Sequence, residues 1–271
     1  MDRAEIDLLF TGTGAADWLA DNEPVRAENG ERRLPASLLV DGHVLIDCGP
    51  GVVEHAASLG LCPQKLTDVV YTHGHPDHFC VSELQRLACA HASRGTLLTV
   101  HAHPVLRQDI DLVEGVVFRP VLPGGSLCFG ELSATALSAN HQGRTRDEQP
   151  LHYVFSKGET AFLYATDGAW LSRDTWTALL QMHLDAVIWD ATTGFHKDDA
   201  RIFEHNSVQM VELMLGAFVR AGVLKEAHTV LLTHLARTLC PAQADLVEAL
   251  AGTGIGPARD GMRLVLAHNG Q

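Results

Sequence analysis

The sequence VVYTHGHPDH, residues 69–78, decides the interpretation of the whole chain. Three histidines and an aspartate follow a short apolar run, which is typical of a buried strand that runs into a loop. In an extended segment, side chains two positions apart point to the same side, so His73 and His75 can converge on one ion. Asp77 and His78 are adjacent and diverge, and they therefore suit a second ion nearby.

Two divalent ions about 3.5–4 Å apart are a known device for activating water against a phosphoryl or acyl centre. The stretch therefore predicts one half of a dinuclear metal site. The competing interpretation is a polar helix N-terminus with surface histidines. With 16 histidines in 271 residues, the pattern H-x-H-x-D-H should arise by chance in roughly a few of every thousand such chains.

Length and composition indicate a globular protein. The chain is 46% hydrophobic over 271 residues, and we expect a single domain that spans residues 1–271. The sequence contains no run of 18 apolar residues and does not begin like a signal peptide, so we expect a cytoplasmic protein without a membrane partner. The six cysteines form no C-x-x-C pair and are expected to be reduced.

The net charge restricts the partners. A formal charge of −13 opposes a polyanion, because nucleic-acid binding uses Lys and Arg to neutralise phosphates. A small phosphorylated substrate stays compatible, since bound divalent ions would make the site locally positive. The sequence leaves a homodimer open.

The order of apolar runs and turn residues predicts strand, helix and hairpin units in two halves, residues 6–139 and 151–266. Hairpins are indicated at residues 36–47, around Asp41-Gly42, and again at residues 151–165. Such frequent hairpins disfavour one all-parallel sheet. We therefore expect an α/β (α+β) fold of four layers, in which two sheets pack face to face between outer helices.

Other segments receive more local predictions. Residues 117–139 are predicted to form consecutive antiparallel strands, and residues 171–182 a helix. Residues 18–34 are polar and read as a surface loop that overhangs the site. The glycine-rich stretch 11–17 has Asp17 where a dinucleotide-binding motif needs glycine, so it predicts a turn near the site.

Polar residues recur where predicted strands stop. His141 follows one strand, Asp167 the next and His234 a later one. Strand ends that meet at one edge of a sheet can bring distant residues into a common site. Taken alone, each histidine would more often be a satisfied or surface residue, but the metal loop in the same chain favours grouping them.

This order of motifs resembles the metallo-β-lactamase superfamily, in which H-x-H-x-D-H is followed by His, Asp and His, here over residues 73–234. The resemblance implies the αββα sandwich already expected. It also implies that one metal is held by His73, His75 and His141, the other by Asp77, His78 and His234, with Asp167 bridging both. Nitrogen and oxygen ligands without thiolate suit Zn²⁺ or Mn²⁺, and also Fe²⁺.

Two later stretches, WDATT at residues 189–193 and EHNS at residues 204–207, resemble the phosphodiesterase branch of that superfamily. This branch contains the tRNA 3′-processing ribonucleases and the carbon–phosphorus lyase accessory phosphodiesterases. The opening TGTGA at residues 11–15 is similar to the latter. His205 is predicted to be the general acid for a departing alkoxide, with Asp190 orienting its ring. The alternative is that His205 only caps the following helix.

The sequence thus predicts hydrolysis of a phosphodiester, namely a small ribosyl or nucleotide cyclic phosphate. Asp77 is predicted to orient the attacking water while it holds its metal, and Arg144 and Arg146 to bind a substrate phosphate. Arg32 and Arg33 are poorer candidates for that role. Three alternatives stay open: a lactone or thioester hydrolase of the same superfamily, a tRNA 3′-processing ribonuclease, and a metal-binding accessory protein without turnover.

Overall fold

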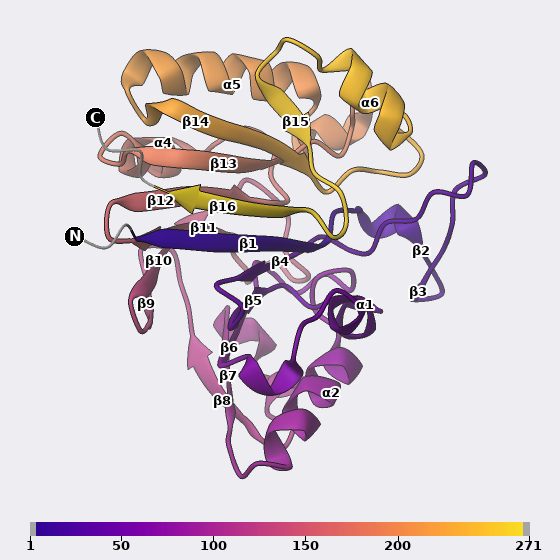
Figure 1. The fold of residues 1–271 in the computed structure, drawn as a ribbon, viewed down its shortest axis with the longest axis vertical. Helices are drawn as coiled ribbons and strands as arrows, with labels where there is room; N and C mark the ends of the chain where they lie inside the picture. Colours follow the sequence, from indigo (N-terminus) through magenta and orange to yellow (C-terminus); the bar gives the residue numbers. More distant parts are fainter. Residues whose placement is uncertain (1–3, 268–271) are drawn as a thin grey trace.

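The computed structural model describes residues 4–267, and it consists of two seven-stranded sheets that pack face to face between outer helices (Figure 1). The strand order is β16-β1-β4-β5-β6-β7-β8 in the first sheet and β15-β14-β13-β12-β11-β10-β9 in the second. The predicted four-layer αββα arrangement is confirmed.

The strands of the first sheet are β1 (Glu5–Gly12), β4 (Ser37–Val40), β5 (Val44–Ile46), β6 (Asp68–Val70), β7 (Leu98–Ala102), β8 (Val116–Pro120) and β16 (Arg263–Ala267). Those of the second sheet are β9 (Ser126–Phe129), β10 (Leu132–Ser138), β11 (Leu151–Lys157), β12 (Thr160–Ala165), β13 (Leu184–Asp190), β14 (Leu224–Thr233) and β15 (Ile255–Pro257). The helices are α1 (Val52–Ser58), α2 (Val81–Ala92), α3 (Arg107–Ile110), α4 (Arg173–Leu179), α5 (Val208–Ala221) and α6 (Gln243–Ala249).

Three apolar layers hold the sandwich together. The central layer joins the inner faces of both sheets and contains Phe10, Tyr153 and Phe155. A second layer packs α1 and α2 against the first sheet, and a third packs α4, α5 and α6 against the second. Each fully buried large side chain contributes about 1.5–3 kcal/mol relative to exposure. The two sheets and their helices are therefore fixed as one packed unit.

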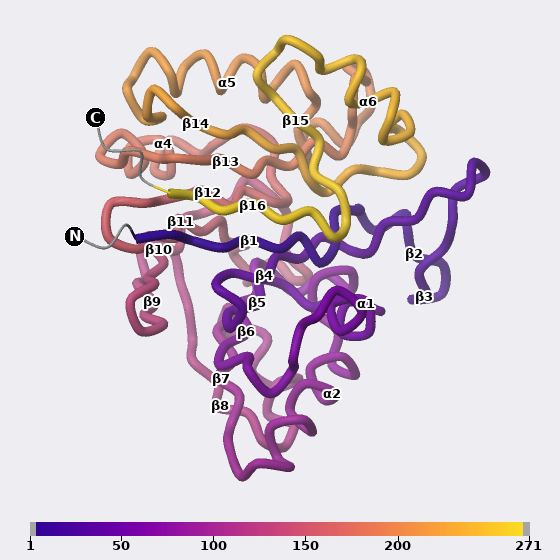
Figure 2. Tube along the Cα trace, in the orientation of Figure 1, coloured from indigo at the N-terminus to yellow at the C-terminus, as the bar shows by residue number. Residues whose placement is uncertain are grey.

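The chain forms six strands of the first sheet, then the whole second sheet, and returns to the first sheet with β16. In Figure 2 the segments from β4 to β8 lie in the lower part of the molecule, whereas β16 at the end of the chain returns beside β1. The two strands pair antiparallel, with Leu8 opposite Leu264. The first and the last strand of the described chain therefore both belong to the first sheet.

Parallel strands determine where the site forms. Strands β5 to β8 run parallel in the first sheet, and β12 to β15 run parallel in the second. The carboxyl ends of parallel strands meet at one edge, and ligands commonly bind outside those ends. The polar residues predicted at strand ends lie there.

The predicted hairpin at residues 36–47 is present. Strands β4 and β5 pair antiparallel across Asp41 and Gly42, whose φ angles are 48° and 68°. Two successive positive φ angles are the requirement of a type I′ turn, which matches the right-handed twist of the strands. The Asp41 carboxylate accepts the Asp7 N–H at 2.9 Å and pairs with Lys157 at 3.0 Å.

Two local predictions were wrong, and one predicted helix is shorter than expected. Residues 117–139 do not form only antiparallel strands, because β8 joins β7 in parallel in the first sheet and only β9 and β10 pair antiparallel. The helix predicted over residues 171–182 is present but shorter, since α4 begins at Arg173 after the cap residue Ser172 and ends at Leu179. The segment 18–34 is not a plain surface loop: it forms the strand pair β2 (Leu19–Ala20) and β3 (Glu23–Pro24), and Arg33 is buried.

Within residues 4–267, none of the helices combines the length and the apolar character needed to cross a lipid bilayer. All six cysteines lie in the described part of the chain and are free thiols, as expected.

The structure predicts that Gly49→Ala destabilises the protein and displaces the histidine-rich loop. A Cβ at Gly49 would overlap the backbone carbonyl of Asp77, and such overpacking costs about 1–3 kcal/mol. We expect a lower melting temperature and less bound metal, measured by calorimetry and elemental analysis. Gly256→Ala is the control, because its Cβ would lie 3.4 Å from Leu231, an ordinary contact. An equal effect of both changes would contradict the prediction.

Candidate metal centre

Three polar residues at strand ends adopt left-handed backbone conformations. These are Asp47 after β5, Asp167 after β12 and His234 after β14, with φ angles of 57°, 53° and 55°. This region is uncommon for residues other than glycine, and such strain costs about 1–3 kcal/mol and concentrates at functional sites. At each position the chain turns sharply at the end of its strand, and all three side chains belong to one polar cluster.

The first group of donor atoms contains His73, His75, His141 and Asp167. The Nδ1 atom of His75 lies 2.9 Å from Nε2 of His73 and 3.2 Å from Nε2 of His141. The Asp167 Oδ2 atom lies 3.3 Å from Nε2 of His73 and 3.7 Å from Nε2 of His141. Residues almost 100 positions apart in the sequence therefore converge on one point.

The second group contains Asp77, His78 and His234. The Nε2 atoms of the two histidines are 3.2 Å apart, and Oδ2 of Asp77 lies 3.4 Å from each. Asp167 contacts this group as well, with Oδ2 at 3.1 Å from His78 and Oδ1 at 2.9 Å from His234. One carboxylate thus contacts both groups, which is the arrangement that the bridging role requires.

The donor atoms fit divalent ions. A tetrahedral site with metal–nitrogen bonds of about 2.0–2.1 Å places its donors about 3.3 Å apart. The separations of 2.9 to 3.7 Å between neighbouring donors agree with this value. The donor set of imidazole nitrogens and carboxylate oxygens suits Zn²⁺, Mn²⁺ or Fe²⁺. The ligand roles and the number of ions remain predictions.

The charge balance agrees with a cation site. Burial lowers the pKa of His73 and of His141 to about 4, so both rings are neutral and offer lone pairs. Burial favours the neutral form of Asp167, yet His234 and His78 hold its pKa well below the ordinary value. In turn, although burial opposes it, Asp167 raises the pKa of His234 to about 10. Protons balance the buried carboxylates, and a divalent ion would replace those protons.

Asp47 supports the second group, and sequence analysis missed it. Its carboxylate is fully buried and lies 2.8 Å from Nδ1 of His78, and it accepts the N–H and the hydroxyl of Thr72 at 2.8 Å each. A carboxylate on the far ring nitrogen fixes the orientation and tautomer of a ligating histidine. Asp47 ends the predicted strand of the first hairpin, so the strand-end criterion that selected His141 could also have selected it.

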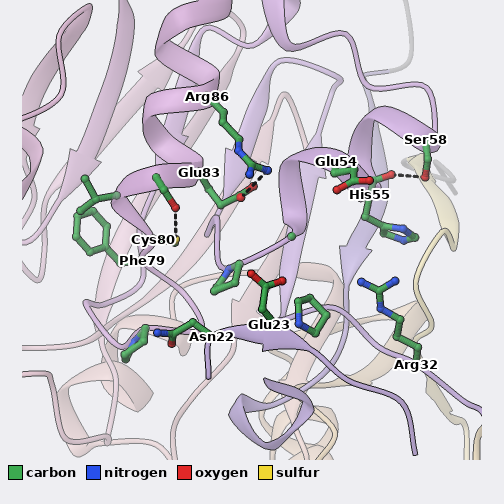
Figure 3. Close-up of a pocket in the computed structure, with 16 residues that line it drawn as sticks. Asn22, Glu23, Arg32, Glu54, His55, Ser58, Phe79, Cys80, Glu83 and Arg86 are labelled. Carbon is green, nitrogen blue, oxygen red and sulfur yellow. Dashed lines mark hydrogen bonds and ion pairs between the residues drawn. The ribbon is translucent and has the colours of Figure 1, made fainter. Parts of the chain in front are cut away.

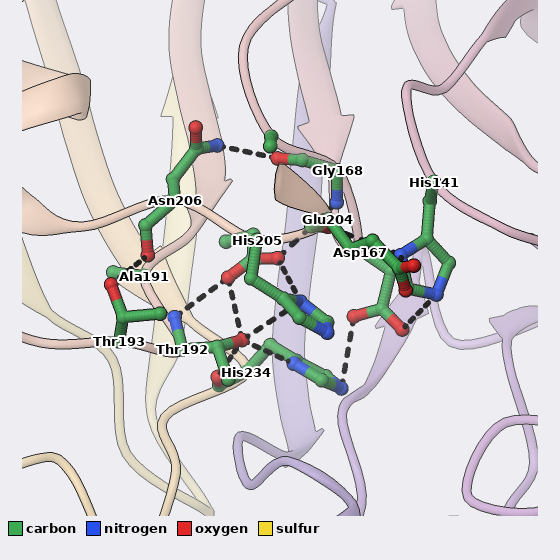
Figure 4. A network of polar contacts seen from close by, with 12 residues as sticks. His141, Asp167, Gly168, Ala191, Thr192, Thr193, Glu204, His205, Asn206 and His234 are labelled. Carbon is green, nitrogen blue, oxygen red and sulfur yellow. Dashed lines mark hydrogen bonds and ion pairs between the residues drawn. The ribbon is translucent and has the colours of Figure 1, made fainter. Parts of the chain in front are cut away.

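His205 and Asp190 form a pair beside both groups. The Nδ1 atom of His205 lies 2.7 Å from Oδ2 of the fully buried Asp190. Figure 4 shows the His205 ring lying almost parallel to the His234 ring. The ring centroids are 5.3 Å apart, and the angle between the ring planes is 11°. The His141 ring is 4.9 Å away. Within residues 4–267, the hydrogen bonds of the His205 ring are made by Nδ1, and Nε2 makes none.

Thr192 links this pair to the metal ligands, and sequence analysis did not assign it a role. Its hydroxyl lies 2.6 Å from Oδ1 of Asp190 and 2.7 Å from Nδ1 of His234. The helix-cap alternative for His205 is not supported, because Ser207 caps α5 by accepting the N–H of Met210.

The structure does not bring the predicted arginines to the cluster by any direct contact. Arg144 and Arg146 are exposed on the loop after His141, and the Arg144 guanidinium pairs with Asp109 at 2.6 Å. Arg33 is structural, since it donates to the Thr13 hydroxyl and to the Ala258 carbonyl. The substrate role of Arg144 and Arg146 remains a prediction.

A cavity of about 610 Å³ borders the metal loop (Figure 3). Pro76 and Phe79 form one side, and the segment around β3 forms another, so part of the early segment does lie against this loop. None of the seven predicted metal ligands lines it. Its Glu83 carboxylate accepts the Val53 N–H and pairs with Arg86, so this wall is structural.

A family model described as beta-lactamase superfamily domain matches residues 43–235, more than half of the chain. The chain belongs to the beta-lactamase superfamily. Together with the His and Asp groups, this membership identifies the protein as a hydrolase of the superfamily, and the resemblance in the sequence is confirmed.

Several solved structures share the fold over almost the entire chain. A diphosphatase from the PhnP family has a TM-score of 0.72 at 21% identity, covering 96% of this chain and 97% of its own. The metallo-beta-lactamase fold protein YhfI from Bacillus subtilis has a TM-score of 0.71 at 16% identity, covering 97% and 99%. The short form of human tRNase Z has a TM-score of 0.67 at 19% identity, covering 95% and 98%.

One curated relative matches locally. A ribonuclease Z from Pyrobaculum calidifontis is 42% identical over 76 residues, which is 27% of this chain and 23% of the ribonuclease. The match thus spans about a quarter of that protein.

Asp47→Asn should weaken metal binding at the second group more than at the first. Loss of a carboxylate behind a ligating histidine typically costs about 10–100-fold in metal affinity. We expect one of two bound ions to be lost first in a competition titration with a chromophoric chelator. Asp68→Asn is the control, because Asp68 forms a similar pair with His101 at 2.7 Å away from the cluster. Unchanged affinity in Asp47→Asn would refute the supporting role.

Proposed function

We propose that the protein is a phosphodiesterase that opens a small ribosyl or nucleotide cyclic phosphate at a centre of two divalent ions. The observation that carries this proposal is the His205–Asp190 pair beside both groups of donor atoms, at 2.7 Å. Opening a cyclic phosphodiester expels an alkoxide, a poor leaving group that needs a proton. A positioned general acid contributes about 10²–10⁴-fold to such a step.

When bound, the two ions would supply activation of water and stabilisation of negative charge on the phosphoryl oxygens. The residues that would hold them are His73, His75, His141, Asp77, His78, His234 and Asp167.

Residues of the chain itself donate the proton to the leaving group and orient the attacking water. Asp190 accepts from Nδ1 of His205, so Nε2 carries the proton that goes to the leaving oxygen. Although burial opposes it, the Asp190 carboxylate raises the pKa of His205, which keeps the ring protonated until that step. We assign Asp77 the orientation of the attacking water, because its carboxylate lies between His78 and His234 at 3.4 Å from each.

Two of the similar structures are described as a diphosphatase and a tRNase, which favours reaction at phosphorus over hydrolysis of a lactone or thioester. A tRNA substrate is a second candidate on the basis of the local ribonuclease Z match. The formal charge of −13 opposes binding of a long RNA, and the sequence contains no run of Lys and Arg that could neutralise its phosphates. We therefore favour the small diester.

A substrate panel tests the proposal. Purified protein with its metal content measured by elemental analysis is compared on bis-p-nitrophenyl phosphate, a cyclic phosphate, a homoserine lactone, a glutathione thioester and a tRNA precursor. We expect activity on the two phosphodiesters. Activity confined to the lactone or thioester would overturn the proposal, and a metal-loaded protein that hydrolyses none of them would indicate an accessory role.

His205→Ala should retain metal but lose turnover according to the leaving group. We expect a loss of about 10²–10⁴-fold on a cyclic phosphate, which expels an alkoxide, and a much smaller loss on bis-p-nitrophenyl phosphate. The reason is that p-nitrophenolate leaves without protonation. His183→Ala is the control, because His183 is exposed and bonds only the Gly222 carbonyl. Equal losses on both substrates would exclude an acid role for His205.

A further inference from the structure

Two aromatic side chains are exposed on the segments that carry the site. Phe203 is 79% exposed and Trp170 is 44% exposed, and no other Phe, Tyr or Trp between residues 4 and 267 belongs to the exposed class. Trp170 follows Asp167 by three positions, and Phe203 precedes His205 by two. At about 3.8 Å between consecutive Cα atoms, both rings are attached within roughly 11 Å of a site residue.

The turn that carries Trp170 is held from both sides. On one side, Ala169 exchanges two hydrogen bonds with Asn140, the residue before His141. On the other side, the Asn206 amide donates to the Gly168 carbonyl at 2.6 Å and accepts the Trp170 N–H at 2.8 Å. The turn therefore lies between the segments of His141 and His205.

Trp170 adopts a strained conformation in this turn. Its φ of 55° lies in the left-handed region, which is unfavourable for a bulky side chain and costs about 1–3 kcal/mol. Glycine would relieve the strain without losing the hydrogen bond to Asn206. The chain instead keeps a large apolar ring at this position and leaves it partly in water.

Phe203 lies on a second turn that is tied to the same histidines. It ends the short helix η4 (Ala200–Phe203), and the N–H groups of Glu204 and His205 both donate to the Arg201 carbonyl. The Glu204 carbonyl lies 3.1 Å from Nδ1 of His141. Both aromatic residues thus belong to turns anchored at His141 and His205, whose rings are 4.9 Å apart.

We propose that Trp170 and Phe203 form an aromatic platform at the mouth of the metal centre, on which the base of a nucleotide substrate stacks. This inference rests on the proposed phosphodiesterase function and narrows its substrate to a nucleoside cyclic phosphate. A cation centre selects a phosphate, and exposed aromatic rings select a flat ring. A mononucleotide carries both groups one sugar apart, whereas a ribosyl cyclic phosphate carries only the first.

The first experiment compares a substrate with a base and one without. Values of kcat/KM are measured for adenosine 2′,3′-cyclic phosphate and for glycerol 1,2-cyclic phosphate. Stacking of a base is worth about 1–3 kcal/mol, which is about 5- to 160-fold. We expect Trp170→Ala and Phe203→Ala to lower the ratio of kcat/KM for the adenosine substrate to kcat/KM for the glycerol substrate by that factor. Trp170→Phe should keep most of the wild-type ratio.

The control is Val219→Ala, which shortens an apolar side chain that is 51% exposed near the end of α5. Its ratio should equal that of the wild type. A ratio that is unchanged in both aromatic variants would overturn the platform.

The second experiment does not depend on turnover. Adenosine 5′-monophosphate is titrated into the metal-loaded protein while tryptophan fluorescence is followed. We expect saturable quenching in the wild type, a much smaller signal in Trp170→Phe and weaker binding in Phe203→Ala. Quenching without hydrolysis of either cyclic phosphate would support the platform and refute the phosphodiesterase. Hydrolysis of both without quenching or preference for the base would refute the platform alone.

Discussion

The contact of one buried carboxylate with four imidazoles organises this molecule. Asp167 is 2% exposed and lies within 3.7 Å of His73, His78, His141 and His234. An ionised group that is removed from water is tolerated only when it is paired or binds a metal. Because two of these histidines come from the loop after β6 and two from the second half of the chain, this one interaction joins the two sheets at their common edge.

Much of this arrangement could be predicted because it follows from local patterns. Alternating apolar runs mark the strands, and the rule that polar residues follow them selected His141, Asp167 and His234. The failures concern choices that local patterns do not encode. Strand β8 is short and half-exposed. Its parallel pairing with β7 depends on the connection between the two strands and not on the residues of β8.

Contacts between residues far apart in the sequence could not be predicted either. Arg144 looks like a free cation in the sequence, yet Asp109 neutralises it from 35 positions away. Arg33 looks like a surface residue, yet its guanidinium reaches Gln243 across 210 positions and is buried. Thr192 was missed because no spacing in the sequence marks a residue that orients a metal ligand, so its role is visible only once His234 is in place. Asp47 lies at a predicted strand end and could have been selected, but its contact with His78 spans 31 positions and is visible only in the structure.

The acid and the metal ligands cannot be treated as independent parts. Because Nε2 of His234 faces Asp167, Nδ1 of the ring carries a proton and donates to the Thr192 hydroxyl at 2.7 Å. The Thr192 hydroxyl in turn donates to Oδ1 of Asp190 at 2.6 Å, and hydrogen bonds joined in such a chain polarise one another. A change in charge at His234 is therefore felt at Asp190, and through Asp190 at His205. Because Asn206 follows His205 and holds the turn of Trp170, the same short segment connects the proton donor to the mouth of the site.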